Sequence, residues 1–158
     1  FRHVPGLERV RLVQTAPAMG VRESRRVRGR YVLALEDLAA GRRFEDAVCM
    51  ASFGVDIHEP APGAGVPSGH GAPMRPYEIP YRCLVPEEID GLLVAGRCLS
   101  GTHEAHASYR VTGICMATGQ AAGLAAAQAA REGRRPGDLD GRSIRAALAK
   151  RGVGFLDG

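Results

Sequence analysis

The 158-residue chain has no tryptophan, one lysine and few aromatic residues. Lys150 is the only lysine, so the excess of 21 basic over 17 acidic side chains consists almost entirely of arginine. With 5% aromatic residues the chain offers few stacking platforms for single-stranded nucleic acid, and it has no helix-turn-helix or zinc-finger pattern. Nucleic-acid binding is therefore disfavoured.

Closely spaced cysteine pairs are also absent. The four cysteines lie far apart in the sequence, at Cys49, Cys83, Cys98 and Cys115. Without a C-x-x-C pair, neither a zinc ribbon nor a thioredoxin-type site is indicated, and we expect no bound metal. Each cysteine has apolar neighbours, which predicts buried free thiols in a reducing compartment.

Long apolar runs are missing as well. The apolar run at 92–96 is far too short to cross a bilayer, which takes about 20 residues, and no charged-then-apolar leader opens the chain. We therefore expect a cytoplasmic protein that contacts no membrane. The chain begins at Phe1 with residues typical of the interior of a polypeptide, which suggests a fragment or processed product of a longer protein.

The first half of the chain favours extended structure. Alternating or apolar segments predict strands at four places, 10–15, 20–35, 44–57 and 77–86. A strand at the second place would put Arg26, Arg28 and Arg30 on one face, as a charged surface or as a solvated edge without chemistry. A short helix is expected at 35–41, and the proline- and glycine-rich residues 59–76 are expected to form a loop.

The second half favours helices. The apolar run at 92–96 fits a strand buried on both faces, as in a parallel sheet covered by helices. A polar segment, 97–110, then leads into a helix predicted from Thr112 to Arg131, and a last helix is predicted at 141–151. Strands followed by helices in this way indicate an α/β or mixed α+β fold.

The start of the long helix is the most informative feature of the sequence. Thr112 is a plausible N-cap, yet the first turn, GICM, carries no acid to neutralise the free amides and the positive end of the helix dipole. That end is available to an electron-rich group. Gly113, Gly119 and Gly123 each cost about 1 kcal/mol relative to alanine, which indicates the close approach of another backbone or a flat ring. The alternative is a small-residue helix packed on a sheet, with its N-terminus capped by water.

Three blocks of sequence carry a family resemblance. RCLVPEEIDGLLVAGRCLS, THEAHASYRV and CMATGQAAGLAAA resemble the carboxyl-terminal part of FAD-dependent oxidoreductases with a glutathione-reductase-like dinucleotide domain, and GVRESRRVRGRYVL and YEIPYR are similar to further blocks of that group. The resemblance implies a C-terminal flavoprotein fragment in two portions. Residues 1–86 would belong to the substrate domain, and residues 87–158 to the C-terminal portion of the FAD-binding domain.

The same resemblance implies a function and a set of site residues. The helix would aim its N-terminus at the pyrimidine edge of the flavin of FAD, and a small organic substrate with a C–H next to an alcohol or amine would transfer a hydride to the flavin. The implied cofactor-binding residues are Gly96, Arg97, Arg110, Val111, Thr112, Gly113, Gly119 and Gln120. The candidate catalytic residues are His103, His106, Tyr109 and Arg110. We expect the segment 103–106 to be a loop, which either contacts the substrate or is simply solvated.

One departure from the family concerns the ADP part of FAD. The chain has no G-x-G-x-x-G turn backed by an acidic residue, so we expect its partner to be a missing N-terminal FAD-binding half, without which the fragment would be inactive. The rival functions are a non-enzymatic binding or assembly domain and, less favoured, a basic nucleic-acid-binding domain. HEAH, at 103–106, lacks the H-E-x-x-H spacing of a zinc site, and no G-x-S-x-G accompanies Ser100 to support a hydrolase.

Overall fold

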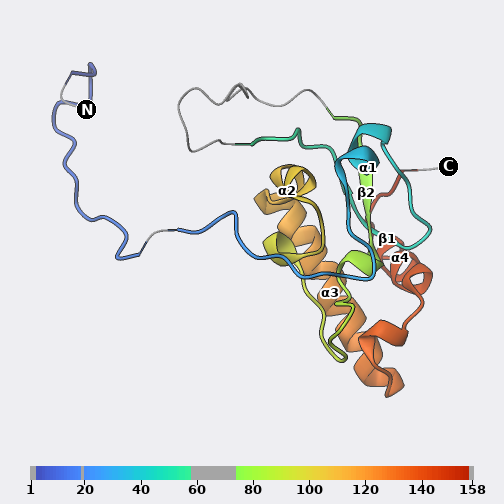
Figure 1. Cartoon of the computed structure of the whole chain (residues 1–158). Coiled ribbons are helices and arrows are strands. Elements are labelled where there is room, and N and C mark those ends of the chain that lie inside the picture. Colours follow the sequence, from blue (N-terminus) through green and yellow to red (C-terminus); the bar gives the residue numbers. More distant parts are fainter. Residues whose placement is uncertain (1–2, 19, 58–73, 157–158) are drawn as a thin grey trace.

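The computed structural model describes residues 3–18, 20–57 and 74–156 of the chain. The elements of these ranges, in chain order, are helix α1 (Leu35–Ala40), strands β1 (Ala47–Ala51) and β2 (Tyr77–Pro80), and helices α2 (His103–Tyr109), α3 (Thr112–Glu132) and α4 (Gly141–Ala149) (Figure 1). Short 3-10 turns occur at Tyr81–Cys83, Gly96–Cys98 and Pro136–Asp138. The described part of the chain is therefore a mixed α/β structure, in agreement with the predicted class.

The sheet is a two-stranded antiparallel pair at the centre of the core. Cys49 lies opposite Ile79 and Ala51 opposite Tyr77, with an irregularity in register between Ala47 and Cys49. Every residue of β2 is buried, and only Met50 of β1 is exposed. Both strands are covered because α3 and α4 pack against β1 and α1 packs against β2. The sheet is consequently an interior element, although it has only two strands.

Helix α3 supplies the longest wall of this core. Its buried residues, Ile114, Thr118, Ala121, Ala125 and Ala129, recur every three or four positions and so share one face. Alanine, the best helix former, dominates its second half. The helix ends where Gly133 adopts a left-handed conformation with φ 61°, as predicted from the glycine at that position.

The extended N-terminal segments form no strand in the described ranges. Residues 10–15 form no β-ladder with a neighbouring segment, and Leu12 and Val13 are 82% and 95% exposed. The segment 20–35 is attached through two isolated bridges, Gly29 with Pro86 and Leu33 with Gly101. The predicted strands are wrong here because a strand requires a neighbour for its hydrogen bonds, and Figure 1 shows the first part of the chain running away from the rest.

Three further predictions about strands need correction. The run 92–96 carries no ladder and Leu92 is 41% exposed, so the buried parallel strand is wrong for the described chain. β1 and β2 are shorter than the predicted 44–57 and 77–86. β2 ends at Pro80, whose ring nitrogen cannot donate to a ladder, and a 3-10 turn follows it.

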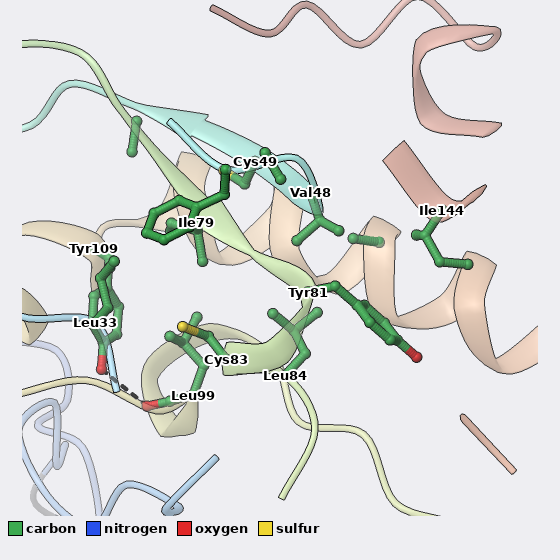
Figure 2. Packing of buried hydrophobic residues seen from close by; sticks show 14 of the residues in the cluster. Leu33, Val48, Cys49, Ile79, Tyr81, Cys83, Leu84, Leu99, Tyr109 and Ile144 are labelled. Carbon is green, nitrogen blue, oxygen red and sulfur yellow. Dashed lines mark hydrogen bonds between the residues drawn. The ribbon is translucent and has the colours of Figure 1, made fainter. Parts of the chain in front are cut away.

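Two predictions stay open. Residues 59–73 of the predicted loop lie outside the described residues. The boundary between portions 1–86 and 87–158 also stays a prediction, and the buried side chains of both portions form one hydrophobic cluster (Figure 2). Among the described residues, no helix combines the length and apolarity needed to cross a membrane.

Gly29 is required by close packing, and this can be tested. A Cβ at Gly29 would lie 2.8 Å from the Cβ of Ser100 and 3.0 Å from the carbonyl oxygen of Arg82. We expect Gly29→Ala to lower the free energy of unfolding by about 1–3 kcal/mol, because backbone and side chain would have to shift. Gly20→Ala is the matched control, since its Cβ would meet nothing within 4 Å. Equal urea midpoints for the two variants would contradict the packing argument.

The cysteines are free, but they are not all buried. Cys49 and Cys83 are buried, Cys115 is partly buried and Cys98 is exposed, so the prediction of uniform burial is wrong for the last two. Burial raises the pKa of the Cys49 thiol to about 12. We expect iodoacetamide to alkylate Cys98 first and to reach Cys49 and Cys83 only after unfolding, as followed by peptide mass spectrometry. Rapid alkylation of Cys83 in the folded protein would contradict the buried core.

Candidate active site at the start of helix α3

Helix α3 begins without a cap. Its N-cap residue is Val111, with φ −71° and ψ 151°, and no side-chain hydrogen bond caps it in the described part of the chain. Thr112 is the first helical residue, so the prediction that Thr112 is the N-cap is wrong by one position. No acidic residue occupies the first turn, as predicted. The helix start therefore presents unneutralised amide dipoles along a 21-residue axis.

A basic cleft lies on one side of this helix start. Its volume is about 470 Å³, and it is lined by Arg97, Arg110, Thr112, Cys115 and Met116. Two of the predicted cofactor-binding arginines are thus brought to the same cleft as the first residue of α3. The Met116 side chain is 70% exposed and adds an apolar rim.

An apolar hollow lies beside the same helix start. It has a volume of about 300 Å³ and is lined by Met50, Ala51, Ser52, Phe53, Val111, Gly113 and Ile114. Met50 and Phe53 keep 45% and 44% of their surface exposed, so both present hydrocarbon surface at the hollow. Because Val111, Thr112 and Gly113 are consecutive, the helix start separates a basic cleft from an apolar hollow. Sequence reasoning missed this hollow, since nothing local brings the end of β1 to α3.

Arg110 is held by protein carboxylates. Its guanidinium, with 6% of the side chain exposed, lies 2.6 Å from Glu23 and 3.3 Å from Asp56. It also donates to the backbone carbonyl of Asp56 at 2.6 Å. The N-terminal segment and the segment after β1 are thereby tied to the α2–α3 junction. Because two carboxylates compensate the charge of Arg110, the charge of Arg97 is the less neutralised of the two in the cleft.

Arg97 belongs to a turn that both helices hold in place. Gly96 has φ 70°, a left-handed conformation that favours glycine, and its amide donates to Thr118 Oγ1 of α3 at 3.0 Å. Arg97 itself is exposed and donates to the carbonyl of Val21 at 3.0 Å. Thr118 is fully buried, and sequence reasoning missed it. A lone threonine in the buried stripe of an alanine-rich helix was the available signal.

The predicted catalytic residues of the HEAH segment lie on a helix. The segment was expected to be a loop, but Thr102 caps α2 by accepting a hydrogen bond from the amide of Ala105 at 3.3 Å. His103 is exposed at the start of α2, whereas His106 and Tyr109 have no exposed surface. Burial raises the pKa of the Tyr109 hydroxyl, and burial followed by the nearby Arg26 lowers the pKa of His106. Both side chains are therefore neutral at physiological pH.

Gly119 and Gln120 lie on the outer face of α3. Both are exposed, and a Cβ built at Gly119 or Gly123 would meet nothing within 4 Å. The close approach expected at these glycines is therefore not made by any described residue of this chain. This outer face is uncharged from Thr112 as far as Ala130.

The hydroxyls of two buried tyrosines, Tyr77 and Tyr81, have partners within the protein. Tyr77 Oη lies 2.7 Å from Ser108 Oγ, and Tyr81 Oη donates to the carbonyl of Pro136 at 2.9 Å. Burial raises the pKa of each hydroxyl to about 12. Neither hydroxyl is presented to the start of α3.

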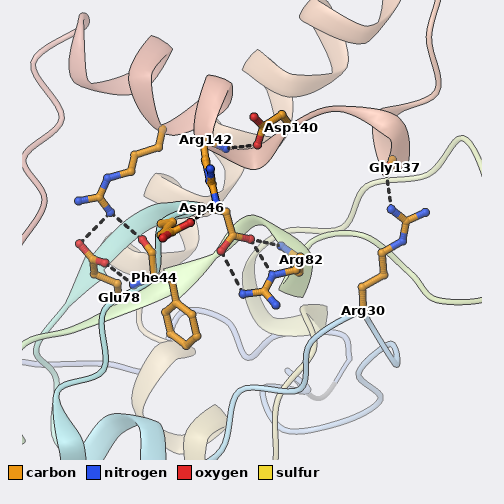
Figure 3. A network of polar contacts seen from close by, with 10 residues as sticks. Arg30, Phe44, Asp46, Glu78, Arg82, Gly137, Asp140 and Arg142 are labelled. Atoms are coloured by element: carbon orange, nitrogen blue, oxygen red, sulfur yellow. Dashed lines mark hydrogen bonds and ion pairs between the residues drawn. The ribbon is translucent and has the colours of Figure 1, made fainter.

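A cavity larger than the cleft and the hollow beside α3 lies elsewhere in the described part of the chain. It has a volume of about 640 Å³ between the turn before α4 and the start of β1. Asp46 binds the guanidinium of Arg82 through both carboxylate oxygens, and Arg30 donates to the carbonyl of Gly137 (Figure 3). Arg82 and Arg30 therefore face acidic and carbonyl partners from the protein. Within the described ranges, no group of three histidine, cysteine or acidic side chains could hold a metal ion.

Comparison with known proteins identifies the family of the chain. A family model for FAD dependent oxidoreductases matches residues 1–148. The chain therefore belongs to the FAD dependent oxidoreductase family, which makes it a flavin-dependent oxidoreductase by class. No curated protein and no solved structure matches it.

Proposed function

We propose that this chain is the C-terminal portion of a glutathione-reductase-like flavoprotein and that the start of α3 lies against the flavin of FAD. The observation that carries the proposal is the uncapped, acid-free start of a 21-residue helix between a basic cleft and an apolar hollow. Such a helix start favours negative charge. The apolar hollow suits a flat ring or the apolar part of a substrate.

The residues around the helix start fit an electron-accepting ring. Bound FAD would supply the redox chemistry by taking a hydride from a substrate C–H next to an alcohol or amine, and an electron acceptor would later reoxidise it. The amides of Thr112 and Gly113 and the guanidinium of Arg97 would favour the negative charge that the reduced ring carries. Gly113 has no Cβ and open space beside it, which lets a flat group approach the backbone.

Water would be excluded mainly from the apolar side. Met50, Phe53 and Ile114 present hydrocarbon surface next to the helix start, and Phe53 is held through its carbonyl, which accepts a hydrogen bond from Ser108 Oγ. A low-dielectric wall strengthens the interaction of the amide dipoles with a charged ring. His103 is the exposed side chain of α2 that could exchange protons with a substrate.

The outer face of α3 would be covered by the missing half of the protein. A helix that is apolar on all sides is normally buried, and α3 is covered on one side only by the described residues. The exposed, uncharged face that contains Gly119, Gln120 and Gly123 would then pack against the dinucleotide-binding half that supplies the G-x-G-x-x-G turn. We place the whole protein in the cytoplasm, where four free cysteines are expected.

Anaerobic spectroscopy of the full-length protein tests the proposal. We expect the purified protein to carry FAD, shown by flavin absorbance, and at least one small alcohol or amine in a substrate panel to bleach that absorbance. A protein that stays colourless after incubation with FAD would support a non-enzymatic binding or assembly domain. Salt-sensitive retention on DNA without flavin would instead support the basic nucleic-acid-binding alternative.

A further inference from the structure

We infer that His106 and Tyr109 are positioning residues, which hold the Gly96–Cys98 turn so that Arg97 faces the start of α3. The inference rests on the proposed function, because it gives these residues a part in flavin binding without contact to the reacting atoms. It replaces the catalytic role that the sequence suggested for them.

The first observation is a pair of side-chain hydrogen bonds from one helix to one turn. His106 Nε2 lies 3.0 Å from the carbonyl oxygen of Arg97. Tyr109 Oη donates to the carbonyl of Leu99 at 3.0 Å, and Figure 2 shows this second bond. Both side chains are fully buried, and the bond from Tyr109 to Leu99 is buried as a whole. Helix α2 thus fixes two carbonyls of the same short segment.

The second observation fixes the tautomer of His106. A carbonyl oxygen only accepts hydrogen bonds, so Nε2 must carry the proton, and Nδ1 of the neutral ring is then an acceptor. Nδ1 is buried and has no hydrogen-bond partner among the described residues. The ring therefore makes one donated bond, and its burial keeps it from the contact with substrate that a catalytic acid or base needs.

The third observation is the close packing of the His106 and Tyr109 rings against each other and of Gly101 against Tyr109. The His106 and Tyr109 rings meet edge to face, with centroids 5.2 Å apart. A Cβ at Gly101 would lie 2.6 Å from Tyr109 Cε1, so the chain after the turn needs glycine to pass the tyrosine. The charged side chains that act on His106 are Glu23, Arg26 and Arg110. The two arginines oppose protonation of the ring, and the carboxylate of Glu23, which favours it, is paired with Arg110.

The turn is therefore clamped from two sides. Thr118 of α3 accepts the amide of Gly96, while His106 and Tyr109 of α2 bind the carbonyls of Arg97 and Leu99. These contacts set the position of Arg97 relative to the helix start, where it lines the basic cleft. Loss of one hydrogen bond from α2 would let the turn relax, and the guanidinium of Arg97 would then move away from the amides at the start of α3.

Replacement of His106 by leucine and by glutamine separates donation from packing. Glutamine places its amide N–H near the position of Nε2 and keeps a donor, whereas leucine fills similar space without one. In the full-length protein we expect His106→Leu to weaken FAD binding about tenfold and His106→Gln to restore it to within about threefold of the wild type. Tyr109→Phe keeps the ring against Gly101 but removes the donor, so it should also weaken FAD binding. It replaces His106→Leu in the test if that variant does not fold.

A second readout does not involve flavin. Nitrogen-15 NMR of labelled histidine should show the His106 ring protonated at Nε2 alone, and this signal should persist as the pH falls through the ordinary range of histidine. A ring protonated at Nδ1 would overturn the inference. So would equal FAD affinities for His106→Leu, His106→Gln and the wild type, or equal losses in both variants. Failure of the wild-type protein to bind FAD would overturn the proposed function instead, while the NMR result still judges the clamp.

Discussion

Thr112→Asp combined with Gly113→Glu is expected to weaken FAD binding about tenfold or more, or to lower the flavin midpoint potential by about 30 mV or more. Two carboxylates in the first turn of α3 would neutralise the free amide dipoles and repel a ring that becomes negative on reduction. The reduced state loses more than the oxidised state, so the potential falls. Dithionite titration with a reference dye and fluorescence titration of FAD in the full-length protein measure the two quantities.

The matched control adds the same two charges far from the cleft. Ala146 and Ala149 are exposed on α4, and Ala146→Asp with Ala149→Glu should leave both the affinity and the potential near the wild-type values. If the two double variants behave alike, net charge rather than the helix start would explain the effect. Wild-type values for the variant at Thr112 and Gly113 would show that α3 does not face the flavin.

Glu78→Ala should be the most destabilising single change in the described core, by about 3–5 kcal/mol. Glu78 is 1% exposed, yet its carboxylate is fully engaged. Oε2 accepts the amide of Phe44 at 2.8 Å, and Oε1 accepts Arg145 at 3.0 Å and the amide of Leu156 at 3.1 Å (Figure 3). Alanine would leave the two amides without an acceptor and the charged Arg145 with only the carbonyl oxygen of Phe44. Urea unfolding followed by circular dichroism measures the loss.

Two variants keep this prediction specific. Glu78→Gln retains one carbonyl oxygen and nearly the same volume, so it should lose less stability than alanine does. Glu88→Ala removes an exposed carboxylate and should change stability by less than about 0.5 kcal/mol. A Glu78→Ala variant as stable as Glu88→Ala would mean that the three donors find water or other acceptors at little cost.

The part of the site that local chemistry controls was predictable. The start of α3 and its lack of acids follow from the sequence 111–116, and its end follows from Gly133. The boundary was off by one residue because Val111 and Thr112 both precede the apolar repeat closely. The helical HEAH segment also had a local signal, a threonine cap at Thr102, but its histidines favoured a loop with chemistry.

The part that depends on distant residues was not predictable. Arg110 was expected to face a flavin or substrate oxygen, and only the folded chain shows it between Glu23 and Asp56. Burial of His106 and Tyr109 likewise depends on the turn after Ala95 folding back over α2. Residues 10–15 and 92–96 have strand-like patterns, but the described chain brings no neighbour beside them to complete a ladder.

The sequence by itself determined the family, the long helix and the electropositive character of its first turn. These depend on hydrogen bonds and side chains within a few residues of one another, so one sequence window contains their cause. The tertiary structure decided that β1 places an apolar hollow beside that turn, that carboxylates neutralise Arg110, and that two candidate catalytic side chains are buried. Such properties arise from contacts between segments far apart in the chain, where the packing of the whole core selects the partner.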